Sequence, residues 1–130
     1  MCEKPIILAV DDNEDSLLLL LYALESFDCT VITETDGQSA LTTAVSRKPD
    51  LILLDIVLPT LCGMDCIYLL KRNLITQNIP IIAVTALARS EERELIFLNG
   101  CDDYVSKPYM LDDLEAAVCR YLPCVPVCPV

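Results

Sequence analysis

Short, solidly apolar runs alternate with stretches of helical spacing along the chain. The apolar runs predict buried strands at 6–10, 29–33, 51–54, 80–84 and 104–106. Helical spacing predicts helices at 16–27, at 64–73 and after the Asp36-Gly37 turn, where Pro49 closes the unit. A fourth helix is expected from Ser90, acting as its cap, to residue 99, with Gly100 as terminator, and a fifth carries Leu111, Leu114, Val118 and Tyr121 or Leu122 on one face.

Five strands alternating with five helices predict an α/β fold with a parallel sheet covered on both faces. Such burial explains why the strands are continuously apolar rather than alternating. The 130 residues suffice for one domain, which we expect at 1–122. The remaining segment, 123–130 (PCVPVCPV), cannot continue a helix through its prolines and is expected to be an extended tail.

Polar residues follow the apolar strands where each strand ends. Asp11 and Asp12 follow the first, Asp55 follows the third, Thr85 the fourth and Lys107 the fifth. Parallel strands present their carboxyl ends at one edge of the sheet, which is where ligands bind in doubly wound folds. Each acid alone is readily explained as a turn former or helix cap. Turn-forming or capping roles for the acids do not explain why a hydroxyl and an ammonium follow the next two strands. The five polar residues taken together therefore predict a functional site.

Close carboxylates at this edge need positive charge. Two of them about 4 to 5 Å apart repel by roughly 3 to 4 kcal/mol at an effective dielectric near 20. Lys107 supplies one charge, and a hard divalent cation would supply two more. Mg²⁺ is the expected cofactor, because it commonly takes one or two carboxylates and keeps waters for phosphate oxygens to replace.

Charge and composition exclude several classes of protein. The formal net charge of -11 and a pI near 4.1 argue against binding to nucleic acid. The longest apolar run, 17–24, is far too short to span a membrane, and the first residues carry no secretion signal, so we expect a cytoplasmic protein. Neither Cys62 with Cys66 nor the group Cys119, Cys124 and Cys128 has the spacing of a zinc site, and the chain contains no histidine. Reduced thiols are the simplest interpretation of the eight cysteines, and a metal or redox role is the alternative.

The segments AVDDNED, LLDIVLPTLCG, VTA and DYVSKP, in this order, resemble the receiver domain of two-component response regulators. The resemblance covers residues 5–122 and implies a flavodoxin-like (βα)5 fold with strand order 2-1-3-4-5. It implies that Asp55 accepts a phosphoryl group from a sensor histidine kinase or a histidine phosphotransfer protein. It also implies that Asp12, Asp55 and the backbone carbonyl of Val57 ligate Mg²⁺, with Asp11 acting through a coordinated water.

The same resemblance implies roles for four further residues. Lys107 would pair with Asp55 and then with the phosphoryl group, and Thr85 would donate its hydroxyl to a phosphoryl oxygen. Pro108 would follow a cis peptide bond. Tyr104 would be the switch aromatic that turns inward as Thr85 moves, with a plain packed aromatic as the alternative.

Signalling through a downstream protein target is the function that we expect, and the chain would catalyse only its own phosphorylation and dephosphorylation. A homodimer through the fourth helix, fifth strand and fifth helix is compatible with this interpretation. Alternatives are a relay intermediate that passes the phosphoryl group onward, a non-catalytic scaffold and a receiver cut from a larger regulator. A metal-dependent phosphatase is disfavoured because Val57, not an acid, stands two residues after Asp55.

Two apolar features lead to further expectations. Val57 and Leu87 cannot position a water by hydrogen bonding, so we expect slow self-dephosphorylation. Five consecutive leucines, 17–21, cannot all face one core at 100° per residue. One or two should reach the surface, either as a partner-binding patch or covered by the tail.

Overall fold

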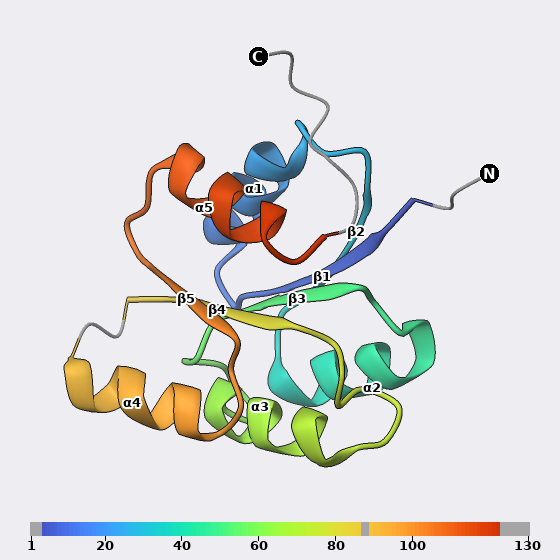
Figure 1. Cartoon of the computed structure of the whole chain (residues 1–130), viewed down its shortest axis with the longest axis vertical. Helices are drawn as coiled ribbons and strands as arrows, with labels where there is room; N and C mark the ends of the chain where they lie inside the picture. The colour runs from blue at the N-terminus through green and yellow to red at the C-terminus, as the bar shows by residue number, and fades with distance from the viewer. Residues whose placement is uncertain (1–3, 87–88, 123–130) are drawn as a thin grey trace.

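The computed structural model describes residues 4–86 and 89–122, in which five strands alternate with five helices (Figure 1). The strands are β1 (Ile6–Val10), β2 (Thr30–Glu34), β3 (Leu51–Leu54), β4 (Ile81–Thr85) and β5 (Asp103–Ser106). The helices are α1 (Glu14–Leu24), α2 (Gly37–Arg47), α3 (Gly63–Arg72), α4 (Ser90–Leu98) and α5 (Leu111–Cys119).

All strand pairs are parallel, and the order across the sheet is β2-β1-β3-β4-β5. The predicted fold class and strand order are therefore confirmed. The register sets Val10 of β1 beside Leu54 of β3, so both strands end at the same level. This alignment brings the residues that follow β1 and β3 together at the carboxyl edge.

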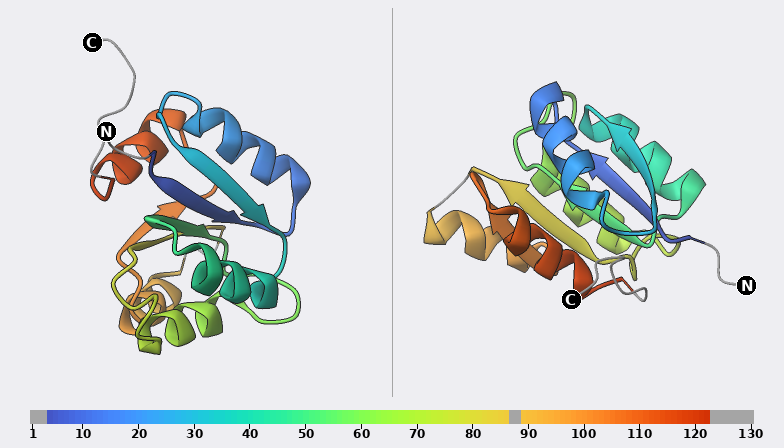
Figure 2. Two further views of the ribbon diagram at one scale, coloured as in Figure 1. Left: turned by 90° about the vertical axis from the view of Figure 1, so that its right-hand side faces the viewer. Right: turned by 90° about the horizontal axis from the view of Figure 1, so that it is seen from above.

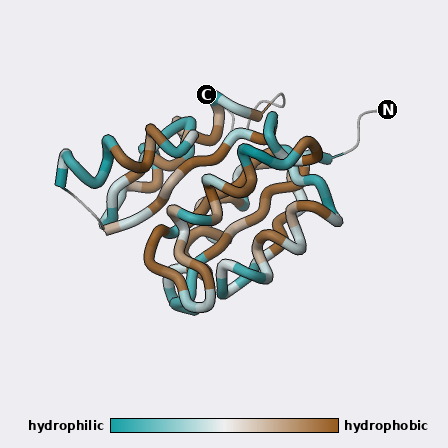
Figure 3. Tube along the Cα trace, turned by 90° about the horizontal axis from the view of Figure 1, so that it is seen from below, coloured by the Kyte–Doolittle hydropathy of each residue, from teal (hydrophilic) through white to brown (hydrophobic). Residues whose placement is uncertain are grey.

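Helices α1 and α5 cover one face of the sheet, and α2, α3 and α4 cover the other (Figures 1 and 2). The two-residue period of a strand sends Leu51 and Leu53 into the core under α1 and α5. Ile52 and Leu54 point into the other core, where they meet α2, α3 and α4. Strands buried on both faces explain the uninterrupted apolar runs, which Figure 3 shows as hydrophobic stretches inside the trace.

The ends of two helices differ from the prediction because of their caps. The first helix begins at Glu14 rather than residue 16, since the Asn13 side chain accepts a hydrogen bond from the Ser16 N–H at 2.9 Å. It ends at Leu24, three residues before the predicted end. The cap of α1 is thus neither Asp11 nor Asp12, which leaves both carboxylates to the strand edge.

Ser90 is not a cap, in contrast to the prediction. It is the first residue of α4, and the cap position belongs to Arg89, whose side chain makes no capping hydrogen bond. Gly100 follows the helix with a φ of +116°, the left-handed conformation that suits a glycine after a helix end. The shifts of the other predicted boundaries are small; β2, for example, begins one residue later than expected.

The leucine run behaves as expected from helical geometry. Leu17 and Leu20 are buried in the core, whereas Leu18 and Leu19 are exposed, together with Tyr22 one turn later. No helix in the described parts of the chain is long and apolar enough to cross a membrane. The predicted tail at 123–130 and Leu87 lie outside the described residues.

Candidate functional site at the carboxyl edge of the sheet

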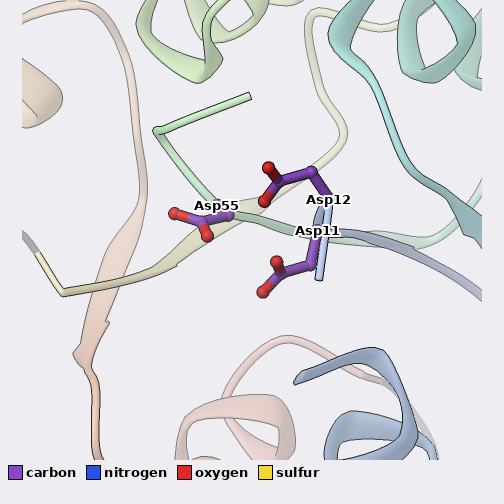
Figure 4. Close-up of side chains that lie close together, drawn as sticks. All are labelled: Asp11, Asp12 and Asp55. Atoms are coloured by element: carbon purple, nitrogen blue, oxygen red, sulfur yellow. The ribbon is translucent and has the colours of Figure 1, made fainter. Parts of the chain in front are cut away.

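The acids that follow β1 and β3 lie together at the carboxyl edge (Figure 4). Backbone hydrogen bonds extend the sheet ladder past the strand ends: the Asp55 N–H donates to the Val10 carbonyl at 3.0 Å, and the Asp11 N–H donates to the Glu34 carbonyl at 3.2 Å. These bonds fix the backbone from which the carboxylates project. Ligand atoms of Asp11, Asp12 and Asp55 all lie within 4.8 Å of one another.

Lys107, which follows the edge strand β5, reaches the acids at the ends of β1 and β3. Its backbone N–H donates to the Thr85 carbonyl at 2.9 Å, which anchors it at the end of β4. Its Nζ atom lies 2.5 Å from Asp11 Oδ2 and 3.0 Å from Asp55 Oδ2. Burial disfavours the charged ammonium, but the hydrogen bonds to Asp11 and Asp55 outweigh burial and raise the pKa of Lys107 above its ordinary value. The ammonium is therefore charged at neutral pH.

Both buried carboxylates use one oxygen for Lys107 and the other for a backbone amide. Asp11 Oδ1 accepts from the Asn13 N–H at 3.0 Å, and Asp55 Oδ1 accepts from the Val57 N–H at 3.3 Å. Asp12, by contrast, is exposed and has no hydrogen bond within the described part of the chain. Hydrogen bonds thus hold the buried carboxylates of Asp11 and Asp55 in place, and the site is open to solvent at Asp12.

This donor set fits a hard divalent cation. Carboxylate oxygens are the ligands that Mg²⁺ prefers, and a carboxylate oxygen can accept a further interaction beyond one hydrogen bond. Asp12 offers an unengaged carboxylate at the open side, while Asp11 and Asp55 offer oxygens already fixed in direction. The cluster of Asp11, Asp12 and Asp55 can therefore hold a metal ion.

Thr85 and Pro108 lie on the two elements that complete this edge. Thr85 is the last residue of β4 and is fully buried. The Lys107–Pro108 peptide bond is cis. A cavity of about 340 Å³ lies beside Lys107, lined by Ser16, Leu19, Ala86, Lys107, Pro108 and Tyr109.

Tyr104 lies on β5, away from the carboxylates, and packs on the core that α4 helps to form. The guanidinium carbon of Arg93 lies 5.6 Å from the centre of its ring. Its hydroxyl oxygen is buried without a hydrogen-bond partner among the described residues. Burial raises the pKa of this phenol, with Arg93 acting in the opposite direction. A buried tyrosine hydroxyl usually has a hydrogen-bond partner, and among the described residues this one has none.

Gly63, which directly precedes the helix predicted at 64–73, was given no role in the site by the sequence interpretation. A Cβ atom at this position would lie 2.3 Å from the Asp55 carbonyl oxygen and 2.5 Å from the Ile56 Cα, while the Gly63 N–H donates to the Ile56 carbonyl at 2.7 Å. Only glycine lets α3 begin this close to the loop that carries Asp55. A glycine eight residues after a strand-end acid, at a helix start, is the signal that could have indicated this.

The cysteines within residues 4–86 and 89–122 are not part of the acid cluster. The five in the described residues have free thiols; Cys66 and Cys101 are buried, and Cys62 and Cys119 are exposed. Burial, with smaller contributions from Cys62 and nearby acids, raises the pKa of Cys66 to about 12. A buried thiol with so high a pKa is a core residue rather than a nucleophile.

Comparisons with known proteins agree with this architecture. A family model described as "Response regulator receiver domain" matches residues 7–119. The chain is 41% identical over 113 residues to the alkaline phosphatase synthesis transcriptional regulatory protein PhoP of Bacillus subtilis. The aligned region spans 86% of this chain but only 46% of the length of PhoP. It is 35% identical over 116 residues to the polar-differentiation response regulator DivK of Brucella anthropi, covering 89% and 94% respectively.

A solved structure with the same fold contains a metal ion. The receiver domain of a sensor histidine kinase from Pseudomonas aeruginosa, with magnesium coordinated in its active-site cleft, superposes with a TM-score of 0.84 at 30% identity, covering 92% of this chain and 98% of that one. The chain therefore belongs to the response regulator receiver domain family of two-component signalling.

Proposed function

We propose that Asp55 is the phosphoacceptor of this receiver and that the donor is a phosphohistidine on a sensor histidine kinase or a histidine phosphotransfer protein. The observation that carries the proposal is the Asp55 carboxylate, held by Lys107 at 3.0 Å beside two further acids at an open edge. In the reaction, an Asp55 oxygen forms a bond to phosphorus as the bond from phosphorus to the histidine nitrogen breaks. The imidazole is the leaving group, and the product is an acyl phosphate on Asp55.

In this proposal Asp12, Asp55 and the backbone carbonyl of Val57 would hold Mg²⁺ directly, and Asp11 would hold it through a water. The cation, when bound, neutralises charge on the transferring phosphoryl oxygens. Asp12 suits direct ligation because its carboxylate is exposed and unengaged. Asp11 and Asp55 are each engaged by Lys107 and one backbone N–H, so the indirect role of Asp11 follows from the resemblance to receiver domains.

Lys107 and Thr85 would receive the phosphoryl group from the side opposite Asp12. Lys107 now bridges Asp11 and Asp55, so a new negative charge on Asp55 offers its ammonium a third acceptor. Thr85 ends the neighbouring strand, and its hydroxyl would donate to a phosphoryl oxygen. Thr85 is the last residue of β4 and Lys107 follows β5, so both lie at the same edge of the sheet as the acids.

We propose that Tyr104 reports phosphorylation to the surface. Movement of Thr85 toward the phosphoryl group would open space for the Tyr104 ring, and the ring would leave Arg93. The unpartnered hydroxyl supports this step, because a phenol without a hydrogen bond loses none when it turns. The outcome is a population shift at the surface of α4, β5 and α5 that changes contact with a downstream protein.

The donor would approach along α1. Leu18 and Leu19 are exposed on this helix, and Leu19 also lines the 340 Å³ cavity that Lys107 shares. An apolar patch next to a reactive site is typical of a protein-docking surface. The face of α4, β5 and α5 remains available for the target or for a homodimer.

Phosphotransfer profiling against the histidine kinases of the source organism tests this function. Radiolabel should pass from a phosphorylated kinase to the wild-type chain with Mg²⁺ and not to Asp55→Asn. Asp65→Asn is the matched control, since Asp65 is exposed in the first turn of α3 and should not affect transfer. Label on the Asp55→Asn protein, or a Mg²⁺-independent reaction, would contradict the proposal.

A further inference from the structure

A groove of about 240 Å³ separates α2 from α3. Leu41 and Val45 line it from α2, Leu69 and Leu70 from α3, and Asn73 and Thr76 from the turn that follows α3. The groove occupies the C-terminal halves of the two helices. Because these crossover helices run against the strand direction, this end lies at the amino edge of the sheet, opposite the acid cluster.

Exposed apolar side chains extend the groove into a larger surface. Tyr68 and Leu69 lie on the outer side of α3, and Leu74 and Ile75 follow its end, with Leu74 84% exposed. Four large apolar side chains within eight residues leave this end of α3 unusually apolar for solvent contact. The surface therefore has the character of a docking site.

Basic residues lie at the same helix ends as this groove, in a chain that is otherwise strongly acidic. The described residues include all nine lysines and arginines, and five of them form ion pairs with carboxylates: Lys4, Lys71, Arg89, Lys107 and Arg120. Three of the other four, Arg47, Lys48 and Arg72, lie at the C-terminal ends of α2 and α3.

Each of these cations alone would be explained by its favourable interaction with a helix C-terminus. Arg72 is also held over the Tyr68 ring, with its guanidinium carbon 3.9 Å from the ring centre. Asp50, two residues after Lys48, keeps its negative charge but is directed to β1, where its carboxylate accepts the Ile6 N–H at 2.8 Å. Asp65 lies at the opposite end of α3. An apolar groove therefore lies at two helix ends that carry three basic residues.

We propose that the α2–α3 groove binds an amphipathic helix of a partner protein that carries glutamates or aspartates beside its apolar ridge. Apolar side chains at i, i+3, i+4 and i+7 would fill the space between Leu41, Val45 and Leu69, as in other helix-in-groove complexes. The flanking acids would meet Arg47, Lys48 and Arg72, whose charges no carboxylate of the described chain takes up.

Charge excludes the other exposed apolar faces as sites for the same helix. On α4, Leu95 and Leu98 share the helix with three glutamates, Glu91, Glu92 and Glu94, against one cation, Arg93. On α1, Leu18 and Leu19 follow Glu14 and Asp15. An acidic helix would be repelled from both faces, so the groove is selective by sign of charge.

A peptide titration of the isotope-labelled full chain tests the proposal. The probe is a synthetic helical peptide with leucines at i, i+3, i+4 and i+7 and glutamates on both flanks, and the control peptide carries lysines in place of the glutamates. NMR chemical-shift changes should map to α2, α3 and residues 73–76 with the acidic peptide only. No binding, equal binding of the lysine peptide, or shifts centred on α1 or α4 would overturn the proposal.

Substitutions in the groove test whether peptide binding depends on this surface or only on the net charge of the chain. Lys48→Glu combined with Arg72→Glu, and separately Leu69→Glu, should weaken binding by about tenfold or more, the range expected for losing close charge pairs or an apolar anchor. Arg93→Glu and Leu98→Glu on α4 are matched controls that should bind as the wild type does. Unchanged NMR spectra of each free variant establish that it is folded. Equal affinity of the groove variants, or sedimentation showing that the groove joins two copies of this chain, would contradict a helical partner.

Discussion

The Nζ atom of Lys107 bridges the two buried carboxylates of the site, at 2.5 Å from Asp11 and 3.0 Å from Asp55. Three carboxylates gather at this edge, and one ammonium is the cation that the described chain places among them. The charge excess is the physical reason for a divalent ion here, because neighbouring carboxylates in a partly buried site repel unless cations offset them.

Replacing Lys107 by Met should make folding stability depend on Mg²⁺. Loss of the ammonium leaves Asp11 and Asp55 facing each other, and we expect a cost of about 1 to 3 kcal/mol in the absence of metal. Saturating Mg²⁺ should recover much of this loss and stabilise the variant more than the wild type. Urea unfolding with and without Mg²⁺ measures both effects. Equal stability of the two proteins without metal would contradict the bridging role.

Removing the Tyr104 hydroxyl should not destabilise the unphosphorylated protein. The hydroxyl is buried without a hydrogen-bond partner in the described part of the chain, so Tyr104→Phe removes an unsatisfied polar group and should leave the free energy of unfolding unchanged or slightly higher. Tyr121→Phe is the matched control, because its hydroxyl donates to the Asp102 carbonyl at 3.0 Å, and it should lose about 0.5 to 1.5 kcal/mol. Chemical denaturation compares the two. A larger loss from Tyr104→Phe would show that its hydroxyl has a partner.

The caps of two helices predict unequal effects of similar substitutions. Asn13→Ala removes the side chain that accepts the Ser16 N–H, and it should cost about 1 kcal/mol. Ser90→Ala changes an exposed residue without a capping bond and should alter stability by less than about 0.5 kcal/mol. Thermal unfolding monitored by circular dichroism can rank the variants. The reverse order would restore Ser90 as the cap that its sequence position suggested.

Thiol labelling should depend on pH in a residue-specific way. Burial raises the pKa of Cys66 to about 12, so its reactive thiolate stays scarce well above neutral pH. Exposed Cys62 should be alkylated in the native protein while Cys66 is not, as read by peptide mass spectrometry. In the unfolded chain Cys66 ionises near its ordinary pKa of 9.0, so its contribution to stability is full below that pH and is lost as the pH rises toward about 12. Alkylation of Cys66 at the same rate as Cys62 would contradict this.

The arrangement of the strands and the composition of the site were predictable because each follows from a simple constraint. Leu51, Ile52, Leu53 and Leu54 can all be buried only between two helical layers, which predicts a parallel sheet. A parallel sheet then brings the residues after its strands to one edge, whatever the details of the loops. The close approach of Asp11 and Asp55 also needs the strand order 2-1-3-4-5, which the resemblance to receiver domains implied and the structure confirms.

Features that depend on single contacts were not predictable in the same way. Asn13 and Ser90 are both good capping residues, and only the observed backbone shows that Asn13 caps α1 while Ser90 lies inside α4. The bond of Lys107 to Asp11 depends on where the β5 loop ends. Arg72 has no carboxylate partner among residues 4–86 and 89–122, and this follows from the positions of distant acids, which a local sequence pattern does not contain.

Phosphorylation of the purified chain by acetyl phosphate tests the central claim most directly. Incubation with acetyl phosphate and Mg²⁺ should raise the intact mass by one phosphoryl group, and the modified peptide should be the one that contains Asp55. Chelation of Mg²⁺ or the substitution Asp55→Asn should abolish the modification, whereas Asp65→Asn should not. An unmodified wild-type chain under these conditions would favour a non-catalytic scaffold, and modification that persists in Asp55→Asn would contradict the assignment of Asp55 as the phosphoacceptor.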